Sequence, residues 1–206
     1  MSEPGLYVVA SPSGGGKSSL IRALLERDER VRLSVSHTTR PPRPGETDGE
    51  HYHFVDRPAF ERLVASDAFL EHAEVFGNRY GTSREGVEKQ MRDGFDVMLD
   101  IDWQGARQVR AAFPSCCGIF ILPPSMQVLR DRLTGRRQDE PEVIERRMRA
   151  ARSEISHWRE FDFLVINDIF SEALEDLFSI IRRGKLHRSG QHDRVREILA
   201  DFLESE

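Results

Sequence analysis

The stretch that decides the fold lies near the N-terminus and reads Leu6-Tyr7-Val8-Val9-Ala10-Ser11-Pro12-Ser13-Gly14-Gly15-Gly16-Lys17-Ser18. Its first five residues are apolar, which predicts a short buried strand. Apolar residues then recur at helical spacing and predict a helix from about Ser18, at Leu20, Ile21, Leu24 and Leu25. The residues between match the pattern G-x-x-x-x-G-K-[ST], with Ser11 in place of the first glycine. Strand, glycine-rich loop and helix in this order predict a phosphate-binding loop.

The residue types in this loop suit the binding of a nucleoside triphosphate. Glycines let backbone N–H groups turn toward phosphate oxygens, and the helix N-terminus adds a positive dipole. We expect Lys17 to meet the transferring phosphoryl group and the Ser18 hydroxyl to hold Mg²⁺. The loop residues expected to bind the nucleoside triphosphate are Ser11, Pro12, Ser13, Gly14, Gly15, Gly16, Lys17, Ser18 and Ser19. The loop alone leaves ATPases, GTPases and kinases open.

Apolar strands alternate with helical stretches in the second half of the chain. The strands are predicted over residues 95–102, 118–122 and 163–166. Their unbroken apolar character is typical of a parallel sheet covered on both faces. We therefore expect an α/β fold with a three-layer core built from residues 1–33 and 92–206.

The middle of the chain does not show this alternation of apolar strands and helices. An amphipathic helix is expected over residues 58–66, among shorter strands over 32–39, 50–55 and 69–76. Residues 34–91 are thus expected to form an inserted mixed α/β lobe.

Two further segments are expected toward the C-terminus. An arginine-rich stretch at about 134–152 predicts a second insert, and a closing helix is expected at about 194–203.

Composition excludes several classes of protein. The formal net charge is −5, and among the 30 cationic side chains only Lys17, Lys89 and Lys185 are lysines. The acidic balance argues against general coating of nucleic acid, and no apolar run approaches the roughly 18 residues of a membrane span. The N-terminus resembles no signal peptide, so we expect a cytoplasmic protein. The adjacent Cys116 and Cys117 predict core thiols and not a disulfide framework or a zinc site.

Two arginines in a stiff loop suggest where a second anion binds. Arg40 and Arg43 lie three residues apart among prolines and offer forked donors that suit a dianionic phosphate. Tyr52 and Tyr80 are candidates for further hydroxyl donors. From spacing alone, a solvated loop with incidental arginines is an equal alternative.

Asp100 and Asp102 close a predicted strand. Alternation puts both carboxylates on one side of the strand, at the carboxyl end where α/β sheets bind ligands. The alternative is that these carboxylates cap the following helix.

Several motifs in the same order as in a known family make the sequence resemble the guanylate kinases, from about Val8 to Ile181. They are the phosphate loop and residues 34–46, 49–55, 69–74, 77–82, 99–105 and 165–168. The resemblance implies a single guanylate-kinase-like domain over about 4–184, with a P-loop core, a GMP-binding lobe and a small helical, arginine-bearing lid at about 134–152. It implies phosphorylation of GMP, and of dGMP, by ATP with Mg²⁺, a step in purine nucleotide metabolism and GMP recycling.

The resemblance also implies roles for residues on the GMP side. Ser36, Glu71 and Thr82 are expected around the guanine base, with Asp102 near its amino group. The GMP phosphate is expected to meet Arg40, Arg43, Tyr52 and Tyr80. Asp100 is expected near Mg²⁺, together with Ser18, although the two aspartates are interchangeable at this stage.

On the ATP side, the resemblance aligns lid arginines with the triphosphate and the adenine, namely Arg132, Arg136 and Arg147. Asn167 is expected beside the adenine. Lys17, Arg40, Arg136 and Arg147 are the expected catalytic residues. Arg137 stands where the family usually has a glycine. The other arginines nearby, Arg130, Arg146, Arg149 and Arg152, are interpreted as a solvated helix face paired with Asp131, Glu142 and Glu145.

Two other functions remain open at this stage. A kinase acting on a ribose bisphosphate would keep the phosphate loop but would not need Ser36, Glu71 and Thr82 together. A guanylate-kinase-like module that binds proteins without catalysis would tend to lose the loop, so the intact Lys17-Ser18 pair argues against it. We expect small-molecule substrates and neither a nucleic acid nor a membrane as partner, and the sequence leaves a homo-oligomer open.

Overall fold

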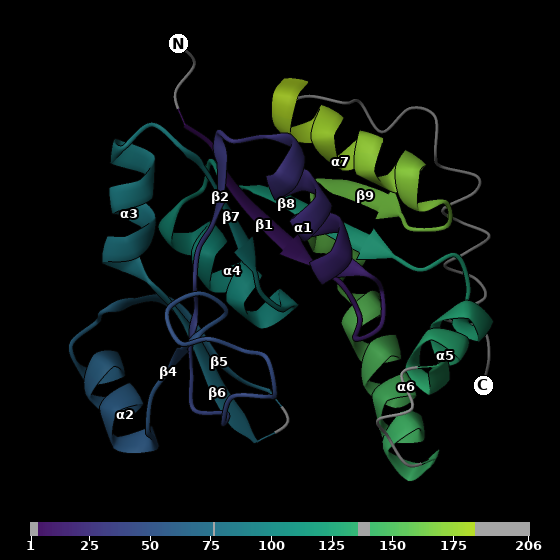
Figure 1. The fold of residues 1–206 in the computed structure, drawn as a ribbon, viewed down its shortest axis with the longest axis horizontal. Helices are drawn as coiled ribbons and strands as arrows, with labels where there is room; N and C mark the ends of the chain where they lie inside the picture. Colours follow the sequence, from purple (N-terminus) through teal and green to yellow (C-terminus); the bar gives the residue numbers. More distant parts are fainter. Residues whose placement is uncertain (1–3, 76, 136–140, 184–206) are drawn as a thin grey trace. The chain divides into compact units, whose positions relative to one another are not determined.

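The computed structural model describes residues 4–75, 77–135 and 141–183, which form two compact units (Figure 1). The first unit contains the described residues of 4–8 and 29–116, and the second contains those of 9–28 and 117–183. Strand β1 (Leu6–Ala10) is fully buried and runs from the first unit into the second.

The first unit contains part of a parallel sheet, with the strand order β2-β7-β1. Strand β2 (Val31–Leu33) pairs in parallel with β7 (Asp96–Asp100), so that Val31 lies opposite Asp96. Helix α3 (Arg84–Arg92) packs on β7, whose Val97, Met98 and Leu99 are all buried. Burial of consecutive residues is what a parallel strand covered on both faces requires.

A second sheet in the first unit has the order β4-β3-β6-β5. Its strands are β3 (His37–Thr38), β4 (His53–Phe54), β5 (Phe69–Val75) and β6 (Asn78–Ser83). Helix α2 (Arg57–Ala65) is N-capped by Asp56 and buries Phe60 against Phe69, with ring centroids 4.7 Å apart. Helix α4 (Trp103–Ala112) packs on β5.

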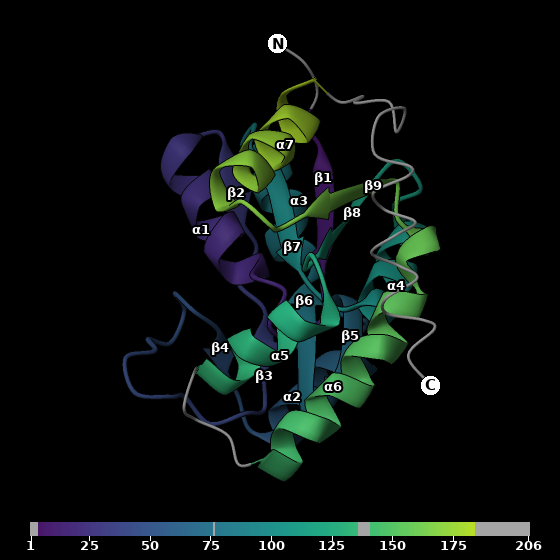
Figure 2. The same cartoon turned by 90° about the vertical axis from the view of Figure 1, so that its right-hand side faces the viewer.

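The second unit continues the parallel sheet with the order β1-β8-β9. Strand β8 (Cys117–Leu122) pairs in parallel with β9 (Phe163–Ile166). Helices α1 (Lys17–Arg27) and α7 (Phe170–Arg183) lie side by side, and Arg27 pairs with Glu175 on α7 (Figure 1). Helix α5 (Met126–Gly135) packs on α6 (Pro141–Ser156), which the 3₁₀ turn Trp158–Glu160 follows (Figure 2).

The expected parallel α/β core is confirmed, whereas several strand boundaries differ. The strand expected over 32–39 is two strands, β2 and β3, in different sheets. The chain leaves the parallel sheet after Ser34, whose N–H still donates to the Met98 carbonyl. Of the strand expected over 50–55 only His53 and Phe54 form a strand, while Tyr52 makes an isolated bridge with Asp48. The N–H groups of Glu50 and His51 donate to the Thr47 carbonyl and form turns instead.

The expected lobe boundaries and the expected C-terminal helix stay predictions. The division between residues 33 and 34 and between 91 and 92 differs from the two compact units, and it stays a prediction. The helix expected over 194–203 lies outside the described residues. None of the helices among the described residues is long and apolar enough to span a membrane.

Candidate active site

The phosphate loop joins β1 to α1 in the second unit, as the sequence predicts. Gly14 and Gly16 have φ angles of 94° and 92°, a left-handed conformation that side chains disfavour. The Gly15 N–H donates to the Pro12 carbonyl at 2.8 Å, which closes the turn. Helix α1 begins at Lys17, so Ser18 and Ser19 lie on its exposed first turn. The loop therefore presents a helix N-terminus and backbone N–H groups, the elements of an anion site.

Side chains from three other elements contact the loop or one another there. The Asn167 side chain, just after β9, donates to the Gly15 carbonyl at 2.9 Å. Arg132 of α5 donates through NH2 to the Asn167 carbonyl at 2.8 Å. The Glu154 carboxylate of α6 accepts from the Ser13 N–H at 3.2 Å. The loop is thus held by β9 and α6.

Arg132 carries a donor that is suited to an anion. Its buried NH1 group has no hydrogen-bond partner among the residues that the structure describes. Burial lowers the pKa of Arg132, since the charged guanidinium is partly desolvated. A buried cationic donor next to a phosphate loop is satisfied best by a phosphate oxygen.

The structure describes only some of the arginines that are expected in the lid. Arg147 lies half-buried on α6, two helical turns before Glu154 and on the same face. Arg136 and Arg137 lie outside the described residues. Arg130 pairs with Glu145 through both guanidinium NH groups on an exposed face, which confirms the structural interpretation of that arginine.

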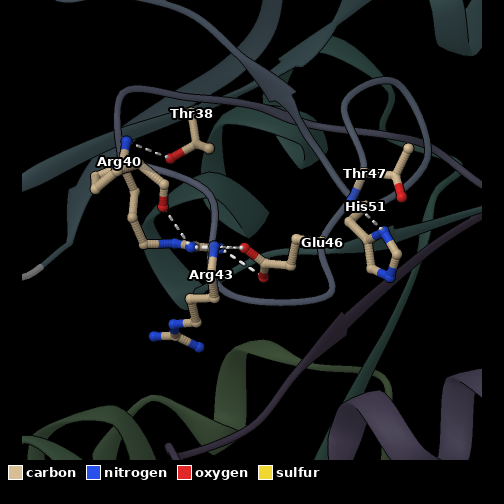
Figure 3. Close-up of polar contacts among 7 residues, drawn as sticks. Thr38, Arg40, Arg43, Glu46, Thr47 and His51 are labelled. Atoms are coloured by element: carbon tan, nitrogen blue, oxygen red, sulfur yellow. Dashed lines mark hydrogen bonds and ion pairs between the residues drawn. The ribbon is translucent and has the colours of Figure 1, made fainter.

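Arg40 in the first unit is held by an acidic residue that was not among the expected site residues (Figure 3). Its NH1 and NH2 groups donate to the two Glu46 carboxylate oxygens at 2.8 and 2.9 Å. The Arg43 backbone N–H donates to Glu46 at 2.7 Å, while the Arg43 side chain points away from that carboxylate. These donors lower the pKa of Glu46 to about 2, so the carboxylate is ionised at any working pH.

Two tyrosines lie around Arg40. The Arg40 guanidinium lies 5.2 Å from the Tyr52 ring centroid, and the rings of Tyr52 and Tyr80 meet edge to face at 6.0 Å. The interaction with Tyr80 contributes, after that with Glu46, to raising the pKa of Arg40. Burial, followed by the Asp100 carboxylate, raises the pKa of Tyr52. The structure thus brings Arg40, Tyr52 and Tyr80 together, with Asp100 close enough to act on Tyr52.

Glu71 and Thr82 form the buried polar centre of the first unit. Antiparallel pairing of β5 and β6 places them directly opposite each other, and they are 3% and 0% exposed. The Thr82 hydroxyl donates to Glu71 Oε1 at 2.5 Å, and the Ser36 hydroxyl lies 3.5 Å from that of Thr82. Three expected site residues from distant segments therefore meet.

The environment of Glu71 perturbs its ionisation. Burial raises the pKa of Glu71 to about 7, opposed by the Thr82 hydrogen bond and assisted by the Asp102 carboxylate. A buried carboxylate poised to ionise near neutral pH is typical of a ligand-binding site.

Of the two aspartates expected to close one strand, only Asp100 does so. The strand ends at Asp100, so Asp102 does not belong to it. Asp102 is the N-cap of α4, where it accepts from the Gly105 N–H at 2.9 Å and from the Gln104 amide at 3.0 Å. The strand position predicted for Asp102 is therefore wrong, and the alternative that this carboxylate caps the following helix is confirmed. Its contact with a guanine amino group stays a prediction.

Glu46, Gly105 and Glu154 are contacts that sequence reasoning did not assign. A Cβ on Gly105 would lie 2.5 Å from Glu71 Oε2, so glycine allows α4 to approach this carboxylate. A glycine inside a helix is a recognisable signal, since it costs about 1 kcal/mol relative to alanine. No local pattern pointed to Glu154, which is distant from the loop in sequence.

Comparisons with known proteins agree with this geometry. The guanylate kinase family model matches residues 3–184. The guanylate kinase of Alkalilimnicola ehrlichii is 59% identical over 96% of this chain and 98% of its own length. That of Escherichia coli K12 is 54% identical over 98% and 99%. The crystal structure of guanylate kinase from Anaplasma phagocytophilum superposes with a TM-score of 0.75, at 34% identity and 96% coverage of both chains. With matches of this identity over nearly its whole length, the chain belongs to the guanylate kinase family.

Proposed function

We propose that the chain transfers the γ-phosphoryl group of ATP to the phosphate of GMP, giving ADP and GDP. The observation that carries this proposal is the buried cluster of Glu71, Thr82 and Ser36 in the same unit as Arg40. A buried carboxylate with hydroxyls beside it suits the donors and the acceptor of a guanine base. A ribose bisphosphate has no base for these groups to bind.

The base is recognised by matching donors to acceptors. Guanine offers an O6 acceptor and donors at N1 and N2, and the ionised Glu71 carboxylate accepts from those donors. Thr82 donates to Glu71 and holds the carboxylate in place, which leaves the Ser36 hydroxyl to donate to O6. Adenine would leave these groups unpaired, so the site rejects it by about 10⁴-fold or more.

The GMP phosphate binds at Arg40, with Arg43, Tyr52 and Tyr80. Glu46 accepts one hydrogen bond from each of NH1 and NH2 of Arg40, so the guanidinium is oriented before the substrate arrives. The exposed Arg43 side chain is available to the same anion. Because these contacts involve the base and the phosphate and not the ribose 2′-hydroxyl, dGMP is a substrate as well.

ATP binds at the phosphate loop of the second unit. Its phosphates meet the loop N–H groups, Lys17 and the NH1 group of Arg132, with Arg147 and Arg136 as further cationic groups. The nucleophile is an oxygen of the GMP phosphate, which is already anionic near neutral pH, so no general base is needed. Catalysis then consists of in-line positioning and neutralisation of charge.

The residues present also fit Mg²⁺. The donors are hard oxygens, the exposed Ser18 hydroxyl and the half-buried Asp100 carboxylate. Within the described residues there is no cluster of three or more His, Cys, Asp or Glu side chains, which suits an ion held mainly by substrate phosphates. When bound with ATP, Mg²⁺ neutralises phosphate charge. We propose that the enzyme acts in the cytoplasm, in GMP recycling.

The experiment that tests the reaction follows the label of [γ-³²P]ATP. Incubation with GMP is expected to give GDP labelled at its β-phosphate, with equimolar ADP. A parallel measurement of ADP release offers dGMP, AMP, UMP and ribose bisphosphate as acceptors. Label on a ribose bisphosphate, or no transfer at all, would contradict the proposal in favour of the related kinase or of a silent binding module.

A further inference from the structure

We propose that Asn167 is a positioning residue for the triphosphate, acting through the phosphate loop and through Arg132. The proposal rests on the binding of ATP at this loop. It concerns how Asn167 works and differs from the expected contact between this side chain and the adenine base.

The position of Asn167 is set by the parallel sheet of the second unit. It follows the last residue of β9, and its N–H donates to the Leu122 carbonyl at the end of β8, at 2.7 Å. The residue is 4% exposed. Its side chain is therefore fixed at the end of two rigid strands and has little freedom to reorient.

The amide of this side chain is in direct contact with the loop backbone. Nδ2 donates to the Gly15 carbonyl at 2.9 Å. A Cβ built on Gly16 would lie 2.0 Å from the same nitrogen, so no side chain fits between the amide and the loop. Gly16 is thus required by its positive φ and also by this close approach.

This contact determines where a backbone donor points. The Gly15 carbonyl and the Gly16 N–H belong to one planar trans peptide unit, in which the two groups point in opposite directions. A hydrogen bond that holds the carbonyl toward Asn167 therefore directs the N–H of Gly16 away from it. That N–H is at the N-terminus of α1, where phosphate oxygens are bound.

The main chain of Asn167 orients a second phosphate-binding group. Its carbonyl accepts from Arg132 NH2 at 2.8 Å, while the buried NH1 of the same guanidinium lies 3.9 Å from the built Gly16 Cβ position. NH1 has no hydrogen-bond partner in the described part of the chain. Asn167 thus contacts both the peptide unit that carries the Gly16 N–H and the guanidinium of Arg132. Donors fixed in advance bind an anion without the cost of ordering them.

The test separates phosphate binding from adenine binding by using a ligand without a base. Dissociation constants for ATP, inorganic tripolyphosphate and GMP are measured by calorimetry for wild type, Asn167→Ala and Asn167→Asp. Asn167→Asp keeps the shape of the side chain but replaces the donor with an acceptor that faces the Gly15 carbonyl. We expect both variants to weaken ATP and tripolyphosphate by the same factor, about tenfold or more, with the aspartate the worse. GMP binding is expected to be unchanged.

A matched control accounts for lost stability. Ile121→Val removes one methylene from the buried strand β8 of the same unit and lowers its stability, with no polar group changed. Tripolyphosphate binding is expected to be unchanged in this control. Equal weakening in the control would reduce Asn167 to a structural role and overturn the proposal.

Other outcomes also decide the matter. Loss of ATP binding with normal tripolyphosphate binding would assign Asn167 to the adenine, against the proposal. Unchanged binding of both ligands would remove any role at the triphosphate. If wild type itself bound neither ligand, the proposed function would fail, which is distinguishable from failure of Asn167 alone. If Asn167→Ala did not fold, the nearly isosteric Asn167→Asp would still give the comparison.

Discussion

Replacing Glu71 by glutamine is expected to stabilise the ligand-free protein while damaging its use of GMP. Burial raises the pKa of Glu71 from its ordinary 4.5 to about 7, so the folded protein holds a proton that the unfolded chain releases. Between these two values the free energy of unfolding falls as the pH rises, because ionisation is favoured in the unfolded chain. Below about pH 4.5 both states are protonated, and above about pH 7 both are ionised.

The size of the effect follows from the shift. A pKa difference of about 2.5, at about 1.4 kcal/mol for each pKa unit, corresponds to roughly 3 to 4 kcal/mol of lost stability across this range. Glutamine cannot ionise, yet its carbonyl oxygen still accepts from the Thr82 hydroxyl. Urea titrations at pH 5 and pH 8 should therefore show Glu71→Gln gaining about 2 to 3 kcal/mol on wild type between the two values.

Function is expected to move in the opposite direction. Glutamine replaces one carboxylate oxygen with an amide donor, so a charge-assisted hydrogen bond to guanine is lost. The kcat/KM for GMP should fall by about 10- to 100-fold, with the KM for ATP unchanged. Wild type should also release a proton from Glu71 when GMP binds near pH 6.5, as calorimetry in buffers of different ionisation enthalpy detects, and Glu71→Gln should not.

Two results would refute this reasoning. A stability difference between wild type and Glu71→Gln that does not change with pH would show that burial does not perturb Glu71. Equal loss in the use of GMP and ATP would show that this residue does not meet the base.

Three further substitutions test other parts of the site. Lys17→Ala should lower kcat in the ADP-release assay by about 10²- to 10³-fold without changing the melting temperature, and normal turnover would remove Lys17 from the reaction. Gly105→Ala places a Cβ 2.5 Å from Glu71 Oε2, so it should raise the KM for GMP and leave that for ATP unchanged; an unaltered KM for GMP would contradict this placement. Glu46→Gln removes one acceptor from the Arg40 fork and should raise the KM for GMP about tenfold with little change in kcat, whereas a lower KM would mean that Glu46 competes with the phosphate.

The core was predictable where independent local signals coincided. Strand β1, the loop and helix α1 each had their own pattern, and the structure places them as expected. Strand β6 had no such signal, because Asn78–Ser83 is mostly polar and becomes a strand only by pairing with β3 and β5. The strands that pair with β6 are determined by tertiary contacts, and the alternation of apolar and polar residues along the chain does not predict them.

Within the candidate site, the sequence indicated the residue types better than their partners. Glu71 and Thr82 were expected near one base, and strand register explains why they meet. The sequence did not predict the pairing of Arg40 with Glu46, because it depends on the geometry of a turn. It also did not predict the contact between Asn167 and the loop, because that contact depends on where two strands end. For Asp102 the partner was predicted wrongly, because the alternation of side chains along the strand was assumed to continue into the N-cap of helix α4.

The most direct test of the central claim is the ratio of kcat/KM for GMP to that for AMP, measured with saturating ATP. A site that pairs Glu71 and Ser36 with the polar edge of guanine should give a ratio of about 10⁴ or more. The same ratio should fall by about 10- to 100-fold in Glu71→Gln, because the use of GMP is weakened. A wild-type ratio near one, or a preference for AMP, would contradict the account.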